Sequence, residues 1–431
     1  MVVVWRSPME SEIAGWISVA ARFVHVLAAI MWIGNSLLFT WMEINLLPPK
    51  SNEAGEGKPN PVLGYLDMLH GGGVFHLQKR VLDPKAIPVP LHWFMWQSYT
   101  TWISGAVLMV SVFYIHGGTA LLDATKSSIT GGTAIAMSIG GIVAGWLVYD
   151  SLWRSKLKNH PMVAIPVSLI LLLGAAWFFN QFFNGRTVYL QIGAMMGTFM
   201  SANVFFHIIQ NQKKYMASLE SGQPHNPDYG KAAKTRSLHN HYMTYPVLFL
   251  MLSAHFPQVT SAAWNIPILA VLVVTLMYGK YLLNSRNQNP NWLVSLLGSL
   301  TLAGILIGVM IVWPEDSVPA PAKTKTSGEV VVEPVIDPNV KAGAKLFISQ
   351  TCATCHQGGS SQLGPSLNGI YGKTVILADN TRVVANDAYL RSSILNPQEQ
   401  IVKGYPAAMP SFGYLEPEQV DQLVAYIKSL K

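Results

Sequence analysis

The residues Cys352-Ala353-Thr354-Cys355-His356 decide the fold of the last fifth of this 431-residue chain. Two thiols at this spacing can both add to the vinyl groups of a haem, and the adjacent histidine then lies beneath the iron. C-x-x-C-H is therefore the attachment signature of c-type haem. A zinc knuckle or a thioredoxin-like dithiol would need a second ligand pair or a βαβ context, and the chain has only these two cysteines. The pattern predicts one covalent haem c, bound by Cys352, Cys355 and His356.

The second axial ligand of the iron follows by elimination. His356 is the only histidine after residue 314, and Met409 is the only methionine there. A His/Met pair raises the reduction potential relative to two histidines, which suits a donor to a terminal oxidase. A five-coordinate haem, against which Met409 merely packs, is the open alternative. The stretches Gly364–Leu367, Met409–Phe412 and Glu416–Leu430 resemble the class I cytochrome c fold, and especially the cytochrome tails fused to haem–copper oxidase subunits.

The rest of the chain has the composition of a membrane protein. Half of all residues are hydrophobic and 12% are charged, about half the charged fraction of a soluble protein. Eight apolar segments approach or exceed the ~20 residues that a bilayer-spanning helix needs. These segments lie at 14–45, 93–116, 132–153, 161–183, 187–210, 239–257, 264–283 and 290–313. We expect an all-α fold, with an eight-span transmembrane helical bundle over 1–313, a Pro-rich linker over 314–337 and a small helical cytochrome c domain over 338–431.

The basic residues predict how the chain is oriented in the bilayer. Fourteen Lys and Arg residues fall in the connections at 46–92, 154–160, 211–238 and 284–289, whereas the N-terminus and the other connections hold only Arg6, Lys126 and Arg186. The positive-inside rule places the first set in the cytoplasm. The N-terminus and the cytochrome domain then lie on the periplasmic face of a bacterial inner membrane, where c-type haem is attached. No basic stripe with interleaved aromatics accompanies the net charge of +7, so nucleic acid is not an expected partner.

Polar residues cluster in two places of the membrane half. One is the run from His70 through Gly71, Gly72 and Gly73 to His76. The glycines allow close backbone approach and offer N–H donors, and the histidines could act as bases or metal ligands. The alternative is a flexible or re-entrant loop with ordinary interfacial histidines.

The second cluster, Arg236–Tyr242, opens the sixth apolar segment with a dense run of hydrogen-bonding groups. It predicts a pocket, although helix capping and interfacial anchoring would also explain it. His25 lies within the first segment, near Arg22. It is either a buried structural histidine or a ligand for haem or quinone.

Five stretches together resemble the bacterial membrane-bound urate oxidase (urate hydroxylase) family: Phe23–Gly34, His70–Lys79, Leu91–Gly105, Arg236–Tyr242 and Pro246–Phe249. Members of that family have eight spans and a C-terminal cytochrome c, so the match covers nearly the whole chain. The combination of stretches is specific, although no single one is. The resemblance implies hydroxylation of urate to 5-hydroxyisourate, with electrons passing through the cytochrome to a terminal oxidase or a soluble cytochrome c.

The resemblance also implies a set of site residues. The catalytic residues would be His70, His76, His239 and Asn240. The substrate contacts would be Gly71, Gly72, Gly73, Arg236, Tyr242 and Trp93. Urate is largely a planar monoanion at neutral pH, so glycine N–H groups and arginine would bind its charge and an aromatic ring would stack on it. A haem b or another redox centre, bound by His25, would relay electrons across the ~30 Å hydrocarbon core.

Three features depart from the family pattern. Val74-Phe75 replaces an aromatic pair, Gln97 an acidic residue, and His241 an asparagine. These departures permit a relative that acts on another purine or heterocycle. Two further interpretations stay open. The chain could be an electron-transfer subunit of a respiratory complex with a catalytically silent bundle. The short stretch His25–Gly34 is also similar to haem-b protoporphyrinogen oxidases and copper-resistance membrane proteins, which usually lack a fused cytochrome c.

Overall fold

The fold is known from a computed structural model of the chain. It describes residues 8–49, 62–80, 90–115, 117–123, 126–221, 227–312, 337–350, 352, 356, 364–405, 409, 411–413 and 415–430. Cys355 and nearly all of the predicted linker 314–337 lie outside the described residues.

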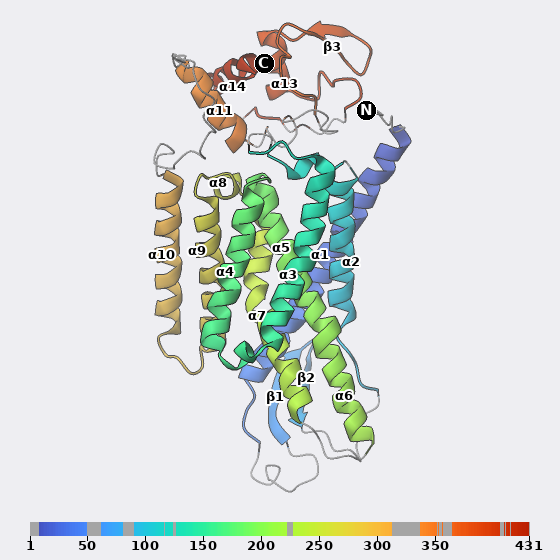
Figure 1. The fold of residues 1–431 in the computed structure, drawn as a ribbon, viewed down its shortest axis with the longest axis vertical. Coiled ribbons are helices and arrows are strands. Elements are labelled where there is room, and N and C mark those ends of the chain that lie inside the picture. The colour runs from blue at the N-terminus through green and yellow to red at the C-terminus, as the bar shows by residue number, and fades with distance from the viewer. Residues whose placement is uncertain are drawn as a thin grey trace.

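Long helices form the membrane half and run side by side (Figure 1). They are α1 (Pro8–Ile44), α2 (Trp96–Met109), α3 (Gly131–Arg154), α4 (Pro161–Asn180), α5 (Gly185–Ala202), α6 (Ile209–Glu220), α7 (Pro227–Leu252), α9 (Asn265–Asn284) and α10 (Trp292–Val312). Short elements connect or extend them: η1 (Val110–Tyr114), η2 (Thr119–Leu121), η3 (Lys156–Asn159), η4 (Asn203–Ile208), η5 (Ser253–His255) and α8 (Pro257–Thr260). Two of these, η1 and η4, are π-helical; η1 extends α2, and η4 joins α5 to α6.

Six helical segments among the described residues are long and apolar enough to cross a bilayer. They are Gly15–Ile44, Gly131–Arg154, Pro161–Asn180, Gly185–Glu220, Asn265–Asn284 and Trp292–Val312. The chain is therefore a mostly helical membrane protein. The other two predicted segments correspond to α2, whose α-helical part has only 14 residues, and to α7, whose first half carries several charged side chains.

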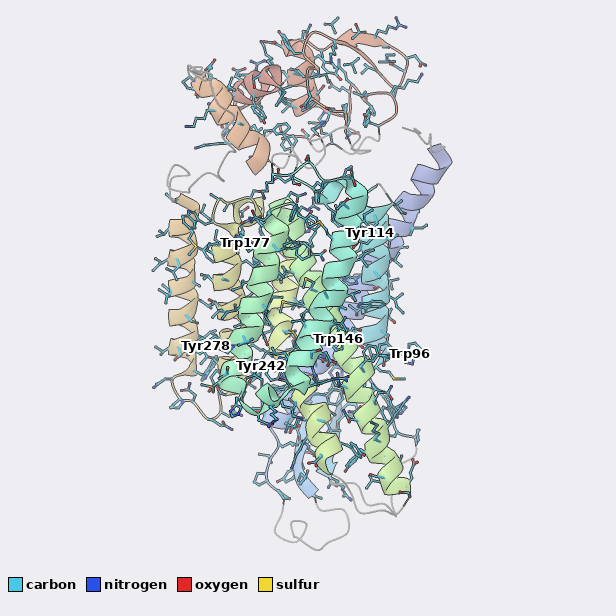
Figure 2. All side chains as sticks on the ribbon, in the orientation of Figure 1. Trp96, Tyr114, Trp146, Trp177, Tyr242 and Tyr278 are labelled. Carbon is cyan, nitrogen blue, oxygen red and sulfur yellow. The ribbon has the colours of Figure 1, made fainter. Side chains whose placement is uncertain are left out.

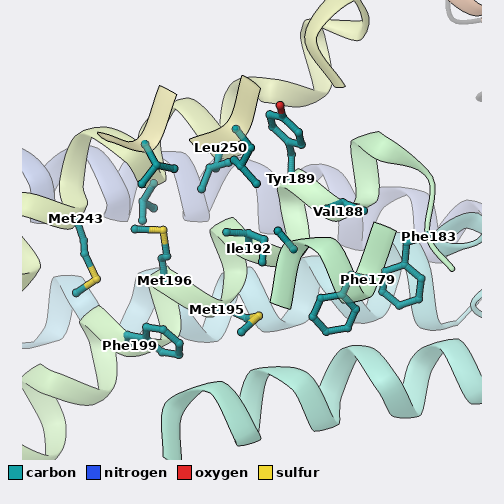
Figure 3. Close-up of a cluster of buried hydrophobic side chains, with 14 of the residues drawn as sticks. Phe179, Phe183, Val188, Tyr189, Ile192, Met195, Met196, Phe199, Met243 and Leu250 are labelled. Carbon is teal, nitrogen blue, oxygen red and sulfur yellow. The ribbon is translucent and has the colours of Figure 1, made fainter. Parts of the chain in front are cut away.

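The centre of the bundle is α5, in which eleven of the 18 residues are buried. Tyr189, Ile192 and Met196 pack among side chains of the neighbouring helices, including Leu250 of α7 (Figure 3). By contrast, α10 packs mainly on α9 and exposes most of its leucines and valines. A helix that is apolar around its whole circumference is typical of a lipid-facing position.

A β-hairpin interrupts the helical pattern and corrects the all-α expectation. β1 (Val62–His70) pairs antiparallel with β2 (Gly73–Arg80). Gly71 and Gly72 form the turn with φ of +60° and +79°, which is the two-residue turn that favours glycine at both positions. The hairpin lies beyond one end of the bundle (Figure 1), which we call the hairpin end.

The C-terminal domain is small and has its own core. It contains α11 (Pro338–Ser349), α13 (Asp387–Leu395) and α14 (Pro417–Ser429), with a two-stranded hairpin of β3 (Thr374–Ile376) and β4 (Arg382–Val384). α11 and α14 cross so closely that a Cβ on Gly343 would collide with the backbone of Gln422. Leu423 and Val424 of α14 face the core with Phe347 of α11.

Candidate functional site

The predicted haem site is described at Cys352, His356 and Met409, whereas Cys355 lies outside the described residues. The Nδ1 of His356 donates a hydrogen bond to the carbonyl oxygen of Pro365 at 2.8 Å, so Nε2 remains for the iron. Burial lowers the pKa of His356, which favours the neutral ring that a metal needs. Cys352 and Met409 both pack against the domain core. These residues fit a covalent haem.

The assignment of Met409 as the axial ligand gives a first prediction. Met409→Ala should lower the midpoint potential of the haem by roughly 100 mV or more, because axial ligands set potentials over a range of about 0.8 V. The haem should stay attached, since the predicted thioether bonds would be made by Cys352 and Cys355. Redox titration of purified protein measures both effects. Met162→Ala, at a side chain that is 87% exposed on α4, is the control. A potential that does not change in Met409→Ala would favour the five-coordinate alternative.

A second group of polar residues forms a buried network at the hairpin end of the bundle. Its centre is Asp150 of α3, which accepts hydrogen bonds from Arg236 of α7 at 2.8 Å and from Nε2 of His207 at 2.6 Å. Arg154 also pairs with this carboxylate at 2.8 Å. The side chains of Arg236 and Asp150 are only 7% and 13% exposed. Charges buried to this degree persist only when they are paired and hydrogen-bonded.

Amide side chains extend this network towards a second histidine. Asn203 accepts a hydrogen bond from Arg236 at 3.3 Å and donates to Asn240 at 2.9 Å and to the hydroxyl oxygen of Tyr149 at 3.0 Å. The same hydroxyl lies 2.8 Å from Nδ1 of His239. We call Tyr149, Asp150, Asn203, His207, Arg236, His239 and Asn240 the Asp150 network.

Three helical elements, α3, η4 and α7, supply the residues of this network. Arg236, His239 and Asn240 stand at positions i, i+3 and i+4 of α7 and therefore share one face. Asn203 and His207 both lie in the π-helical η4. Single π-turns inside α-helices are frequent at functional sites, because the extra residue re-aims the side chains around it.

Aromatic rings surround the two histidines. The Trp153 ring lies 4.0 Å from the His239 imidazole, and Trp146 lies 6.1 Å from His207. Tyr149 stacks on Phe199 at 5.0 Å. Trp146 lies on α3 in the half of the bundle nearer the hairpin (Figure 2). Rings beside hydrogen-bonding groups form an environment suited to a planar heterocycle.

The predicted site residues on the hairpin lie apart from the predicted site residues on α7. His70 and Gly71–Gly73 form the exposed tip of the β1–β2 hairpin. His76 pairs with Asp67 on the neighbouring strand at 2.6 Å, and both side chains are about half exposed. The structure thus brings together Arg236, His239 and Asn240 of the predicted site, and it places the glycine run elsewhere.

The remaining predicted residues lie outside the Asp150 network. Trp93 is half-buried in the segment before α2, and Tyr242 is half-buried on α7, with its ring 5.9 Å from that of His241. His25 of α1 lies against α2, where its Nδ1 is 2.9 Å from the carbonyl oxygen of Thr101. A carbonyl only accepts, so Nδ1 carries the proton and Nε2 keeps its lone pair.

The site predicted from the sequence did not include four members of this network, namely Asp150, His207, Asn203 and Tyr149. A signal was present for three of them. Asp150 is the only acidic residue in the apolar segment 132–153, and Asn203 and His207 interrupt the segment 187–210. Polar and ionisable residues inside membrane helices are costly and by default indicate a functional site.

Comparisons with known proteins match both the membrane region and the C-terminal domain of the chain. A family model described as urate oxidase N-terminal matches residues 11–312, and a cytochrome c model matches residues 340–431. Cytochrome c from Theileria parva is 37% identical over 98 residues, which is 20% of this chain and 81% of the relative. Cytochrome c2 iso-1 from Magnetospirillum molischianum is 35% identical over 92 residues, 19% of this chain and 90% of the relative. Cytochrome c2 from Rhodospirillum rubrum is 29% identical over 109 residues, 21% of this chain and 97% of the relative.

Proposed function

The chain belongs to the urate oxidase N-terminal family and carries a cytochrome c domain, and on this premise we propose that it oxidises urate to 5-hydroxyisourate. A cytochrome-linked membrane oxidoreductase follows from the two domains together. The observation that carries the specific proposal is the Asp150 network. It combines an oriented histidine, a buried ion pair and aromatic rings in the membrane half of a redox protein.

The proposed topology has eight spans, with the hairpin end in the cytoplasm. The spans are α1, α2 with η1, α3, α4, α5 through α6, α7, α9 and α10. Basic residues such as Arg154, Lys156 and Lys158 stand at the hairpin end of α3, which supports this orientation in a bacterial inner membrane. The Asp150 network would then face the compartment in which purines are degraded.

The proposed reaction balances without oxygen as a reactant. Water adds to C5 of urate, a new C–O bond forms, and two electrons and two protons leave. Cys352, Cys355 and His356 would hold haem c, which would supply a one-electron carrier to a terminal oxidase or a soluble cytochrome c. Each urate therefore reduces two haem groups, or one haem twice.

Within the Asp150 network, His207 has the geometry of a general base. Its Nε2–H donates to Asp150, which orients the ring and leaves the lone pair of Nδ1 free to accept a proton. Arg236 balances the charge of Asp150, so it stabilises the carboxylate rather than binding the substrate anion. Trp146 and Trp153 place aromatic surface beside the two histidines, and we propose that urate packs against it.

The electrons must travel far from this network. Asp150 lies nineteen positions after Gly131, which begins α3 at the other end, and this corresponds to about 28 Å at 1.5 Å per position. We extend the proposal with a redox centre bound by His25, whose Nε2 is available and whose ring lies against Gly105, where a Cβ would meet it at 3.0 Å. This relay supplements haem c.

A single anaerobic titration tests the function and the relay together. Urate is added stepwise to oxidised, purified protein while the α-band of the c-type haem is recorded. With haem c as the sole electron acceptor, half an equivalent of urate per chain should complete the reduction, because each urate gives two electrons. A second one-electron centre would raise the requirement to one equivalent. Reduction by dithionite but not by urate would contradict the proposed function and favour an electron-transfer subunit.

A further inference from the structure

A second polar cluster lies on another face of α7 from the Asp150 network. His241 and Tyr245 stand one turn apart on α7, and Lys280 and Asn284 stand one turn apart on α9. Thr40 of α1 also belongs to this cluster, because its hydroxyl oxygen contacts His241. Asn240 and His241 are neighbours in sequence, but Asn240 bonds to α5 and η4 whereas His241 bonds to α1 and α9. The two clusters are therefore separate sites flanking one helix.

Lys280 is the unusual member of this cluster. Only 4% of the residue is exposed, although it lies in a helix apolar enough to span the membrane. Its ammonium group lies 4.8 Å from the centre of the Tyr245 ring. Among the residues that the structure describes, no carboxylate pairs with it, and the neighbouring charge of Arg286 is also positive. A buried cation in this setting needs a compensating anion.

The nearby acidic residue on α1 is already engaged. Glu43 binds Lys79 of the hairpin at 2.6 Å and Lys234 of α7 at 3.5 Å. The other buried cation at this end, Arg236, has Asp150 as its partner. Lys280 thus differs from Arg236 in having no described counter-ion.

The groups around Lys280 can recognise more than charge. Thr40 donates its hydroxyl proton to the carbonyl oxygen of Ser36, so its oxygen accepts from Nδ1 of His241 at 3.2 Å. Nε2 of His241 lies 3.0 Å from Oδ1 of Asn284, so both ring nitrogens of His241 already have partners within the chain. Beside the ammonium group this leaves the Nδ2 donor of Asn284, which matches a C=O group of an oxo-heterocycle.

We propose that Lys280, His241, Tyr245 and Asn284 form a second anion site, separate from the Asp150 network, which binds a small planar oxyanion of the urate class. Lys280 supplies the counter-charge, Asn284 supplies an N–H donor through Nδ2, and His241 orients Asn284. The choice of urate as the occupant rests on the proposed function, which brings this anion to the hairpin end of the bundle. The existence of the site rests on the burial of Lys280, with which no carboxylate of the described residues pairs.

Equilibrium dialysis of radiolabelled urate tests this proposal on the full chain. The protein is first reduced with dithionite, so that bound urate is not consumed. Wild type should bind two urate molecules per chain, and Lys280→Met should bind one. Lys280→Arg, which keeps the charge, should retain both. The c-type α-band and the thermal melting curve show that each variant is folded.

The outcomes separate this inference from the proposed function. If Lys280→Met binds as much urate as wild type, the anion site is wrong, whatever the turnover of the enzyme. If Lys280 binds inorganic phosphate or a phospholipid headgroup in place of urate, the planar-anion assignment is overturned. If urate fails to reduce the haem of wild type, the proposed function fails instead, and binding at Lys280 is judged by the dialysis alone.

Discussion

Replacing His207 by glutamine should lower the rate of urate-driven haem reduction by about 10²–10⁴-fold, which is the usual contribution of a positioned general base. Glutamine can still donate a hydrogen bond to Asp150, so the buried network should keep its geometry. It cannot accept and release a proton as imidazole does. Stopped-flow mixing of urate with oxidised protein, followed at the α-band, measures this rate directly. Haem content and dithionite reduction should match those of wild type.

His70→Gln is the matched control for this experiment. His70 lies at the exposed tip of the β1–β2 hairpin, away from the Asp150 network, so its replacement should change the rate less than threefold. The opposite pattern, with His70→Gln inactive and His207→Gln active, would move the catalytic site to the hairpin. Such a result would support the chemistry that the glycine run suggests in the sequence.

The sequence predicts most of the architecture because its strongest signals are local. C-x-x-C-H specifies haem attachment without knowledge of any tertiary contact, and the cytochrome c match over 340–431 agrees with it. Apolar segments of about 20 residues likewise indicate membrane helices, and six of the eight correspond to helices long and apolar enough to cross a bilayer. The sequence indicated the hairpin less clearly. Its strands carry exposed apolar side chains such as Leu69 and Val74, so apolar and polar residues do not alternate cleanly along them. Its Gly71-Gly72 turn was the available signal.

The candidate site was predicted only in part, for a physical reason. Arg236, His239 and Asn240 share one face of a single helix, so their spacing reveals them. Asp150 and His207 come from other helices, 86 and 29 residues away from Arg236, and only packing brings them to it. The π-turn that aims His207 at Asp150 depends on tertiary context rather than on a recognisable local pattern. The sequence signal for Asp150 and His207 was that each is an ionisable residue within an apolar segment.

Removing the carboxylate of Asp150 should destabilise the membrane domain by about 3–5 kcal/mol, because Asp150→Asn leaves the buried guanidinium of Arg236 without its counter-charge. Thermal unfolding in detergent, with far-ultraviolet circular dichroism as the readout, measures the loss. Asp67→Asn breaks the exposed pair with His76 and should cost about 1 kcal/mol or less. An equally small effect of Asp150→Asn would show that the pair contributes little to the fold.

The double variant Asp150→Leu with Arg236→Met separates stability from chemistry. Replacing both charges by apolar side chains of similar size removes the uncompensated ion, so much of the lost stability should return. Turnover should not return, because His207 would still lack the carboxylate that orients its ring. Recovery of stability without activity would mean that Asp150 is retained for the proton transfer at His207. Recovery of both would mean that the ion pair serves the fold alone, and that the base lies elsewhere in the bundle.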